Sequence, residues 1–269
     1  MDRKIVALDI NPANFFDAAN DLAIWKDFFN KAQEKHQLVF ISSCWQQTIV
    51  YLLDLLSLNN VDVIAESGAI TWFCKTNQYD YQAFLDLASI NVIIHHAVIT
   101  NSGIFTMGKS RVDDTANLSA NYFISLQKYK DFKSLWLTDF EQTLKYENFL
   151  KQLGKLELSS IYVFSPQYHM DLAFIDQIAS GQPRFTHSNF YPNNLLFTSN
   201  KVTKFNALEK YTKTQGLMLK DVHYINLDET LVQNSEQLAS AVFIKKQNNE
   251  GLTVQDIPDV LQKLCAQLL

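Results

Sequence analysis

Four residues that are far apart in the sequence, Asp9, Ser42, Lys204 and Asp228, carry side chains that can do chemistry together. Three of them stand at or just beyond the end of a short apolar run, and Lys204 begins a segment with helical spacing. An aspartate can act as a nucleophile or bind a hard cation, whereas an ammonium and a hydroxyl can stabilise an anionic group. These side chains can act together only if the fold brings the ends of the runs to one place.

The elements that must position these residues alternate between strand and helix. Residues 4–10, 37–43 and 61–66 are short apolar runs rich in β-branched residues, which is typical of buried parallel strands. The segments between them, 15–35 and 46–58, have apolar residues at helical spacing. This alternation predicts βαβ crossovers and a Rossmann-like parallel sheet, in which ligands bind at the carboxyl ends of the strands.

The middle of the chain has a different pattern of predicted elements. Residues 92–99 and 104–107 flank Asn101-Ser102-Gly103, which predicts an antiparallel hairpin. Further predicted elements are helices at 117–130, 140–153 and 171–179 and strands at 160–165, 184–186 and 195–198. The mixture predicts a separate α+β unit.

The strand and helix alternation resumes after this unit. We predict a helix at 204–214, strands at 223–227 and 241–246, and a closing helix at 257–269. The α+β unit is therefore an insertion into an α/β domain. The predicted organisation is a core at residues 1–80, an inserted domain at 81–199 and the rest of the core at 200–269.

The composition excludes several classes of protein. With 47% hydrophobic and 19% charged residues, the 269-residue chain is typical of a packed globular protein. The net charge of −5 with scattered basic residues argues against a nucleic-acid partner. Its three cysteines form no CxxC pair, and neither GxGxxG nor a P-loop is present. No apolar run approaches the roughly 18 residues of a membrane span, so we expect no membrane partner and a cytoplasmic location.

The order of Asp9, Ser42, Lys204 and Asp228 along the chain resembles that in the haloacid dehalogenase (HAD) superfamily, in particular the Cof-type sugar-phosphate phosphatases with a type IIB cap. The family's first strand ends in DxDGT, and this chain has DINPA at 9–13. The hydroxyl-bearing turn after the second strand is matched by ISSC at 41–44, and the Ser/Asn-Gly-Ala turn by AESGAI at 65–70. The family's Lys-Gly-x-Ala-Leu helix start is matched by KFNAL at 204–208, and its Gly-Asp-x-x-Asn-Asp by LDETLV at 227–232.

The resemblance spans nearly the whole chain and implies a fold, an activity and a set of roles. The fold is a Rossmann-like core with an inserted α+β cap that closes over the substrate, and the activity is hydrolysis of a small, sugar-phosphate-like phosphorylated metabolite. Asp9 is the implied nucleophile. The implied phosphate-binding residues are Ser42, Ser43 and Lys204, and the implied Mg²⁺ ligands are Asp9, Asn11, Asp228 and Glu229.

Because the sequence departs from the family pattern, other hypotheses about its function stay open. Asn11 stands where the family has its general acid and base, and an amide cannot carry that proton. Pro12 and Ala13 replace Gly-Thr, and Val232 replaces the last aspartate, for which Glu229 can substitute. One alternative is a catalytically impaired relative that binds a phosphorylated metabolite or a protein partner without turnover. Another is a nucleotide-binding Rossmann module, which the missing glycine fingerprint disfavours.

Two of the assigned residues also have ordinary structural explanations. Ser42 can equally cap the helix that begins near Gln46. A lysine at the start of a helix is unfavourable, because the helix dipole is positive at that end. The presence of Lys204 there favours a role other than solubility. The oligomeric state is not predicted.

Overall fold

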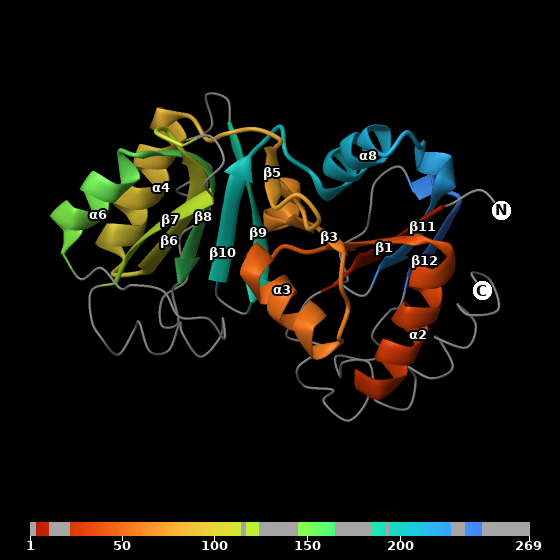
Figure 1. Cartoon of the computed structure of the whole chain (residues 1–269). Coiled ribbons are helices and arrows are strands. Elements are labelled where there is room, and N and C mark those ends of the chain that lie inside the picture. Colours follow the sequence, from red (N-terminus) through yellow and green to blue (C-terminus); the bar gives the residue numbers. More distant parts are fainter. Residues whose placement is uncertain are drawn as a thin grey trace, which may run out of the picture. The chain divides into compact units, whose positions relative to one another are not determined.

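The structure is a computed structural model that describes residues 4–10, 22–113, 117–123, 145–164, 184–191, 194–226 and 235–243. The chain divides into two compact units, one formed by residues 1–77 with 204–269 and the other by residues 78–203. Figure 1 colours both units along the sequence. The boundaries 1–80, 81–199 and 200–269, and the role of the middle part as a cap, stay predictions.

A seven-stranded sheet contains the parallel strands that the sequence predicts. Its order is β12-β11-β1-β2-β3-β4-β5. The strands are β1 (Ile5–Asp9), β2 (Gln37–Ile41), β3 (Asp62–Ala65), β4 (Ile70–Phe73), β5 (Gln78–Tyr81), β11 (Val222–Asn226) and β12 (Ser240–Phe243). The five strands from β12 to β3 run parallel, and β4 runs antiparallel to β3. The predicted α/β class with a Rossmann-like sheet is confirmed.

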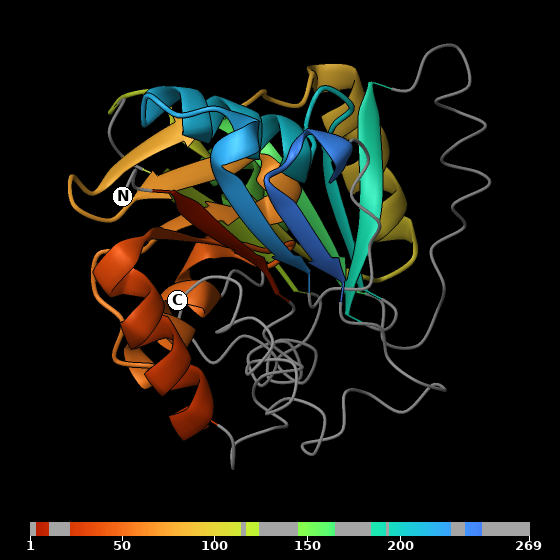
Figure 2. The ribbon, with the colours of Figure 1, turned by 90° about the vertical axis from the view of Figure 1, so that its right-hand side faces the viewer.

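Helices cover both faces of the parallel strands (Figure 2). The helix α8 (Lys204–Thr214) contributes Ala207, Leu208 and Tyr211 to a buried cluster that includes Ile5 and Ala7 of β1. The helix α2 (Leu22–Lys35) packs on the other face, where the rings of Phe29 and Phe40 are 5.2 Å apart. A third helix, α3 (Gln46–Leu55), follows β2. Because alternate residues of a strand point to opposite faces, Asp9 belongs to the face covered by α8.

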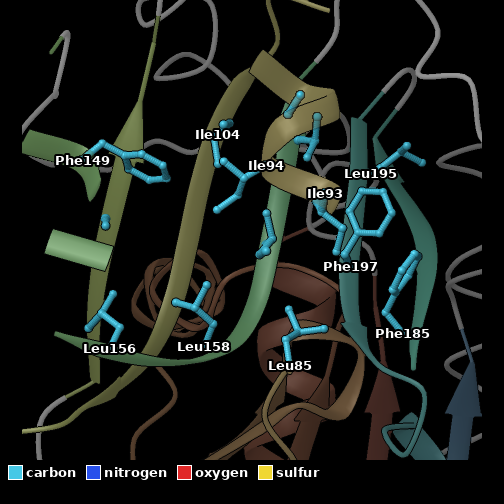
Figure 3. Packing of buried hydrophobic residues seen from close by; sticks show 14 residues of the cluster. Leu85, Ile93, Ile94, Ile104, Phe149, Leu156, Leu158, Phe185, Leu195 and Phe197 are labelled. Atoms are coloured by element: carbon cyan, nitrogen blue, oxygen red, sulfur yellow. The ribbon is translucent and has the colours of Figure 1, made fainter. Parts of the chain in front are cut away.

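The second unit is an antiparallel sheet with helices on it, as predicted for an α+β unit. Its strand order is β7-β6-β8-β10-β9. The elements are β6 (Gly103–Ser110), β7 (Asn117–Tyr122), β8 (Leu156–Phe164), β9 (Phe185–Tyr191), β10 (Asn194–Ser199), α4 (Leu87–Ile99) and α6 (Tyr146–Leu153). Ile93 and Ile94 of α4 and Phe149 of α6 pack with side chains of the sheet in one buried cluster (Figure 3).

The predicted strand at 92–99 is wrong, because these residues belong to the helix α4. Asp86 caps the helix by accepting a hydrogen bond from the backbone N–H of Ser89 at 2.8 Å. The buried residues Ile93, Ile94, His96 and Ala97 form a helical stripe. In a short run of valines and isoleucines, the spacing of apolar residues does not distinguish a buried strand from a buried helix. The β-branched side chains therefore led to the wrong prediction of a strand. The turn at Asn101 therefore joins a helix to β6 instead of joining two strands.

The predicted helix at 117–130 is also wrong where the structure describes it. Residues 117–122 form β7, which pairs antiparallel with β6. The predicted helix at 140–153 is confirmed over α6, and the predicted strands at 160–165, 184–186 and 195–198 correspond to β8, β9 and β10. The predicted helices at 171–179 and 257–269 lie outside the described residues. Among the helices that the structure describes, none is long and apolar enough to span a membrane.

A partly buried polar network lies at the amino end of the parallel strands. The hydroxyl of Tyr211 donates to Oδ2 of Asp62 at 2.8 Å and accepts a hydrogen bond from Nε2 of Gln37 at 2.6 Å. The other carboxylate oxygen of Asp62 accepts from the backbone N–H of Cys74 at 2.9 Å. Since Gln37 and Asp62 begin β2 and β3, this network lies at the opposite end of the strands from Asp9.

We expect the stability of the protein to fall on mild acidification because of His223 in β11. Burial, and then the nearby positive charges of Lys4 and His36, lower the pKa of His223 below its ordinary value of 6.5. The unfolded chain therefore takes up a proton near pH 6.5 that the folded chain resists, so the free energy of unfolding falls as the pH drops through and below this value. Urea titrations between pH 8 and pH 5 measure how the free energy of unfolding changes with pH.

The control is His223→Gln, which retains a side chain able to reach Ser240, whose Oγ is 2.8 Å from Nδ1 of His223. The variant should have a shallower dependence of stability on pH over the same range. An identical slope in both proteins would assign the pH dependence to other groups.

Candidate active site

Asp9 lies at the carboxyl end of β1, the central strand of the parallel sheet. Its neighbours across the sheet are Ile41 of β2 and Asn226 of β11. The chain continues from β1 to β2, which pairs with one edge of β1. The strand β11, which follows much later in the sequence, pairs with the other edge, so the connections lead to opposite sides of β1. In open α/β sheets such a divergence marks the place where ligands bind. Asp9 is fully buried, so its carboxylate needs partners within the protein.

Lys204 supplies one of these partners. Its Nζ is 2.7 Å from Oδ1 of Asp9, and its side chain is 13% exposed. Lys204 is the first residue of α8, a position where the helix dipole disfavours a cation, and the ion pair with Asp9 explains why a lysine is found there. Two of the four residues that the sequence predicted to act together are therefore in direct contact.

Tyr224 supplies the second partner and was not among the predicted site residues. Its hydroxyl donates a hydrogen bond to Oδ2 of Asp9 at 2.6 Å. Tyr224 stands opposite Ala7 in β11, two residues before Asn226, and a tyrosine is long enough to reach along the strand to Asp9. Asn226 is 3% exposed at the end of β11. The signal available in the sequence was that Tyr224 and Asn226 stand two positions apart, which places two polar groups on one face of β11.

The predicted residues Ser42 and Ser43 form a turn directly after β2. Oγ of Ser42 accepts a hydrogen bond from the backbone N–H of Cys44 at 3.1 Å. The helix α3 has Trp45 as its N-terminal cap residue, so Ser42 does not cap it. Oγ of Ser43 accepts a hydrogen bond from the hydroxyl of Ser67 at 2.9 Å. A hydroxyl that accepts a hydrogen bond keeps its own proton, so serine hydroxyls are chemically suited to donate to an anion.

The turn after β3 is tied to the turn after β2. The backbone N–H groups of Glu66 and Ser67 donate to the carbonyls of Cys44 and Ser42, each at 3.1 Å. Glu66, Ser67 and Gly68 have φ values of 55°, 55° and 100°, which is a left-handed conformation that costs energy in the two residues with side chains. The helix α8 packs against this turn.

The remaining predicted residues, Asn11, Asp228 and Glu229, lie outside the described residues. In the sequence Asn11 follows Asp9 by two positions, and Asp228 follows Asn226 by two positions. In the part of the chain that the structure describes, no three His, Cys, Asp or Glu side chains gather as a metal site. The predicted metal ligands thus stay predictions, with Asp9 the one among them whose position is described.

The described side chains have complementary chemistry for an anionic ligand. A buried carboxylate is held in one orientation by an ammonium and a phenol, and serine hydroxyls occupy the turns after β2 and β3. An ammonium that is paired with a carboxylate and partly exposed can also interact with a second anion. The arrangement suits the attack of a carboxylate on an electrophile that carries negative charge, such as a phosphoryl group.

Comparison of sequences identifies a close relative. The uncharacterized protein MG374 of Mycoplasma genitalium is 58% identical over 273 residues, and the alignment covers 100% of both chains. No protein-family model matches the chain.

Comparison of structures finds proteins with the same architecture. A haloacid dehalogenase-like hydrolase from Bacteroides thetaiotaomicron has a TM-score of 0.67 at 11% identity, covering 98% of this chain and 100% of the other. The HAD subclass IIB sugar phosphatase BT4131 has a TM-score of 0.65 at 10% identity, with 99% and 100% coverage. A haloacid dehalogenase-like hydrolase from B. subtilis has a TM-score of 0.61 at 13% identity, with 89% and 88% coverage. At these identities the likeness confirms the predicted HAD fold.

Proposed function

The chain belongs to the same family as the uncharacterized protein MG374 of Mycoplasma genitalium and has the HAD fold, and from this premise we propose that it is a phosphomonoester phosphatase with Asp9 as its nucleophile. The observation that carries the proposal is the contact of 2.7 Å between Asp9 and Lys204 at the end of the central strand. An aspartate that attacks phosphorus needs a neighbouring cation, because two anions otherwise repel each other.

The reaction has two steps. In the first, an oxygen of Asp9 bonds to phosphorus while the bond from phosphorus to the alcohol oxygen breaks. The alcohol oxygen takes a proton from water, which leaves hydroxide, because the amide of Asn11 cannot act as an acid. In the second, water attacks the aspartyl-phosphate at phosphorus, the bond to Asp9 breaks, the hydroxide from the first step takes up the proton that the attacking water loses, and inorganic phosphate leaves. Lys204, Ser42 and Ser43 stabilise the charge on the phosphoryl oxygens in both steps.

Mg²⁺ is the proposed cofactor, with Asp9, Asn11, Asp228 and Glu229 as the residues that would hold it. Carboxylate and carbonyl oxygens are the ligands that Mg²⁺ prefers, and Asp9 offers such oxygens at the strand end where the site is proposed. When bound, the ion would offset the negative charge of the phosphoryl group.

The proposed substrate is a small phosphorylated metabolite, similar to a sugar phosphate. The name of the similar structure BT4131, a sugar phosphatase, supports this class. Residues 81–199 are proposed to act as the cap that selects the substrate. The cytoplasmic location expected from the sequence stays a prediction.

The test is release of inorganic phosphate from an aryl phosphate and from a panel of sugar phosphates, with Mg²⁺ and with a chelator. Release that requires the metal and is lost when Asp9 is replaced supports the proposal. Release that is unchanged by chelator would contradict the assigned cofactor, and absence of release from every substrate would contradict the activity.

A second candidate function is binding of a phosphorylated metabolite without turnover. Two observations favour it: Asn11 occupies the position of the family's general acid and base, and both oxygens of Asp9 already accept hydrogen bonds. Under this alternative the protein binds its ligand with an affinity that depends on Lys204 and releases no phosphate.

We expect Asn11→Asp to raise the rate of phosphate release by about 10²-fold, the lower end of the contribution of a general acid and base, because Pro12 and Ala13 still differ from the family pattern. Steady-state rates at saturating substrate measure the gain. The matched control is Asn59→Asp, which introduces the same charge on an exposed loop of the same unit. Equal rates in wild type and Asn11→Asp would show that a missing acid at this position does not limit turnover.

A further inference from the structure

Tyr224 has a function that goes beyond burying an aromatic ring. We propose that it is a positioning residue that gives the two oxygens of Asp9 different roles: its hydroxyl holds Oδ2, which leaves Oδ1, beside Lys204, as the oxygen that attacks phosphorus. The inference rests on the proposed function and deepens it, because it specifies how the nucleophile is oriented.

The need for such a residue follows from the symmetry of a carboxylate. An aspartate side chain can rotate about its last bond, so its two oxygens are equivalent unless their surroundings differ. Here the surroundings do differ: Oδ1 is 2.7 Å from the ammonium of Lys204, and Oδ2 is 2.6 Å from the hydroxyl of Tyr224. The cation lies next to Oδ1, where it can also offset the charge of a phosphoryl group during attack. Attack from Oδ2 would occur beside a neutral phenol.

Burial makes the orientation persistent. Asp9 is fully buried and Tyr224 is 1% exposed, so water does not compete for their hydrogen bond. Tyr224 lies within β11, which pairs with β1 along its whole length, so the phenol and the carboxylate are carried by adjacent strands. Each oxygen of a carboxylate has more than one lone pair, so the hydrogen bond leaves Oδ2 able to accept another partner.

Geometry excludes the role of proton donor to the leaving group. In phosphoryl transfer the attacking and leaving oxygens lie on opposite sides of phosphorus, roughly in line. A hydroxyl that is 2.6 Å from the carboxylate is on the attacking side. Tyr224 therefore does not replace the acid that is missing at Asn11, and its contribution is to orient Asp9.

The experiment compares Tyr224→Phe with Tyr211→Phe. Both variants remove a buried hydroxyl that donates to a carboxylate in the same unit, but the hydroxyl of Tyr211 donates to Asp62 at the opposite end of the strands. The kcat and KM for phosphate release are measured first. Binding of beryllofluoride, a mimic of a phosphoryl group on aspartate, is then followed with Mg²⁺ by fluorine NMR, which reports on Asp9 without turnover.

For Tyr224→Phe we expect kcat to fall by about 10- to 100-fold with little change in KM, the size of effect typical of residues that orient a catalytic ligand. The beryllofluoride concentration that half-saturates the protein should rise by a similar factor. Tyr211→Phe should match wild type in both measurements. If Tyr224→Phe does not fold, 4-fluorophenylalanine at position 224 preserves the ring and most of its volume while removing the donor.

The outcomes separate the two proposals. If wild type releases phosphate or forms the beryllofluoride adduct and the position 224 variants do the same with equal kcat and affinity, the role of Tyr224 is wrong and the proposed function survives. If both tyrosine variants lose kcat equally, the loss reflects stability and the role of Tyr224 is again wrong. If wild type shows neither reaction nor adduct, the proposed function fails, and the inference fails with it.

Discussion

Replacement of Asp9 by asparagine is expected to lower the rate of phosphate release by roughly 10⁴-fold or more, the loss seen when a catalytic nucleophile is removed. Asparagine has the size of aspartate but cannot form the acyl-phosphate, because its amide is a poor nucleophile. The reduction is measured in kcat with Mg²⁺ present. Binding of substrate should persist, since Lys204, Ser42 and Ser43 are retained.

The matched control for this variant is Asp62→Asn. Asp62 is also a carboxylate of the parallel sheet that accepts hydrogen bonds from a tyrosine and from a backbone N–H, but it lies at the amino end of the strands. Its replacement should leave the rate unchanged. If Asp9→Asn releases phosphate at the wild-type rate, the assignment of the nucleophile is wrong, irrespective of the rate measured for Asp62→Asn.

Replacement of Lys204 by methionine is expected to impair both stability and catalysis. Methionine retains the apolar stem but leaves the carboxylate of Asp9 buried without its ammonium partner. Breaking a buried ion pair in this way typically costs about 3–5 kcal/mol in the free energy of unfolding. Losing one donor to the phosphoryl oxygens costs about 10²–10³ in rate. Urea unfolding and steady-state kinetics measure the two effects.

Two further variants make this prediction specific. Lys213→Met removes an exposed ion pair with Glu209 from the same helix, whose Nζ to Oε1 distance of 2.7 Å equals that in the buried pair. An exposed pair contributes little, so this control should cost at most about 0.5 kcal/mol and leave the rate unchanged. In the double variant Asp9→Asn with Lys204→Met, the stability cost of the lysine replacement should shrink because no buried charge remains. An undiminished cost would show that Lys204 stabilises the fold by packing alone.

The parallel sheet and the positions of Asp9 and Lys204 were predictable, because each depended on a strong local pattern. The strand β1 is an uninterrupted buried run, and the start of α8 at Lys204 follows directly from its helical spacing. The contact between Asp9 and Lys204 could be expected once Asp9 was placed at the carboxyl end of a parallel strand and Lys204 at the start of a helix beside the sheet.

The errors arose where local pattern and tertiary context disagree. The run at 92–99 is rich in β-branched residues, yet it is helical because it packs one face on the antiparallel sheet and has a cap at Asp86. The hydrogen bond from Tyr224 to Asp9 depends on the register between β1 and β11, which single-sequence patterns do not specify. The left-handed conformation of Glu66 is imposed by the contacts of its turn, against the preference of a residue with a side chain.

The position of β1 between β2 and β11 has a consequence for the order of events during synthesis. β1 leaves the ribosome before the second unit, but its partner β11 begins at residue 222, after the whole second unit has been made. At typical translation rates the delay is about 10 to 40 s. During that interval one edge of the central strand lacks its native neighbour, and Asp9 has neither Lys204 nor Tyr224 beside it. The nascent chain thus carries an apolar strand edge with an uncompensated carboxylate, and the carboxylate can remain hydrated until the last strands arrive.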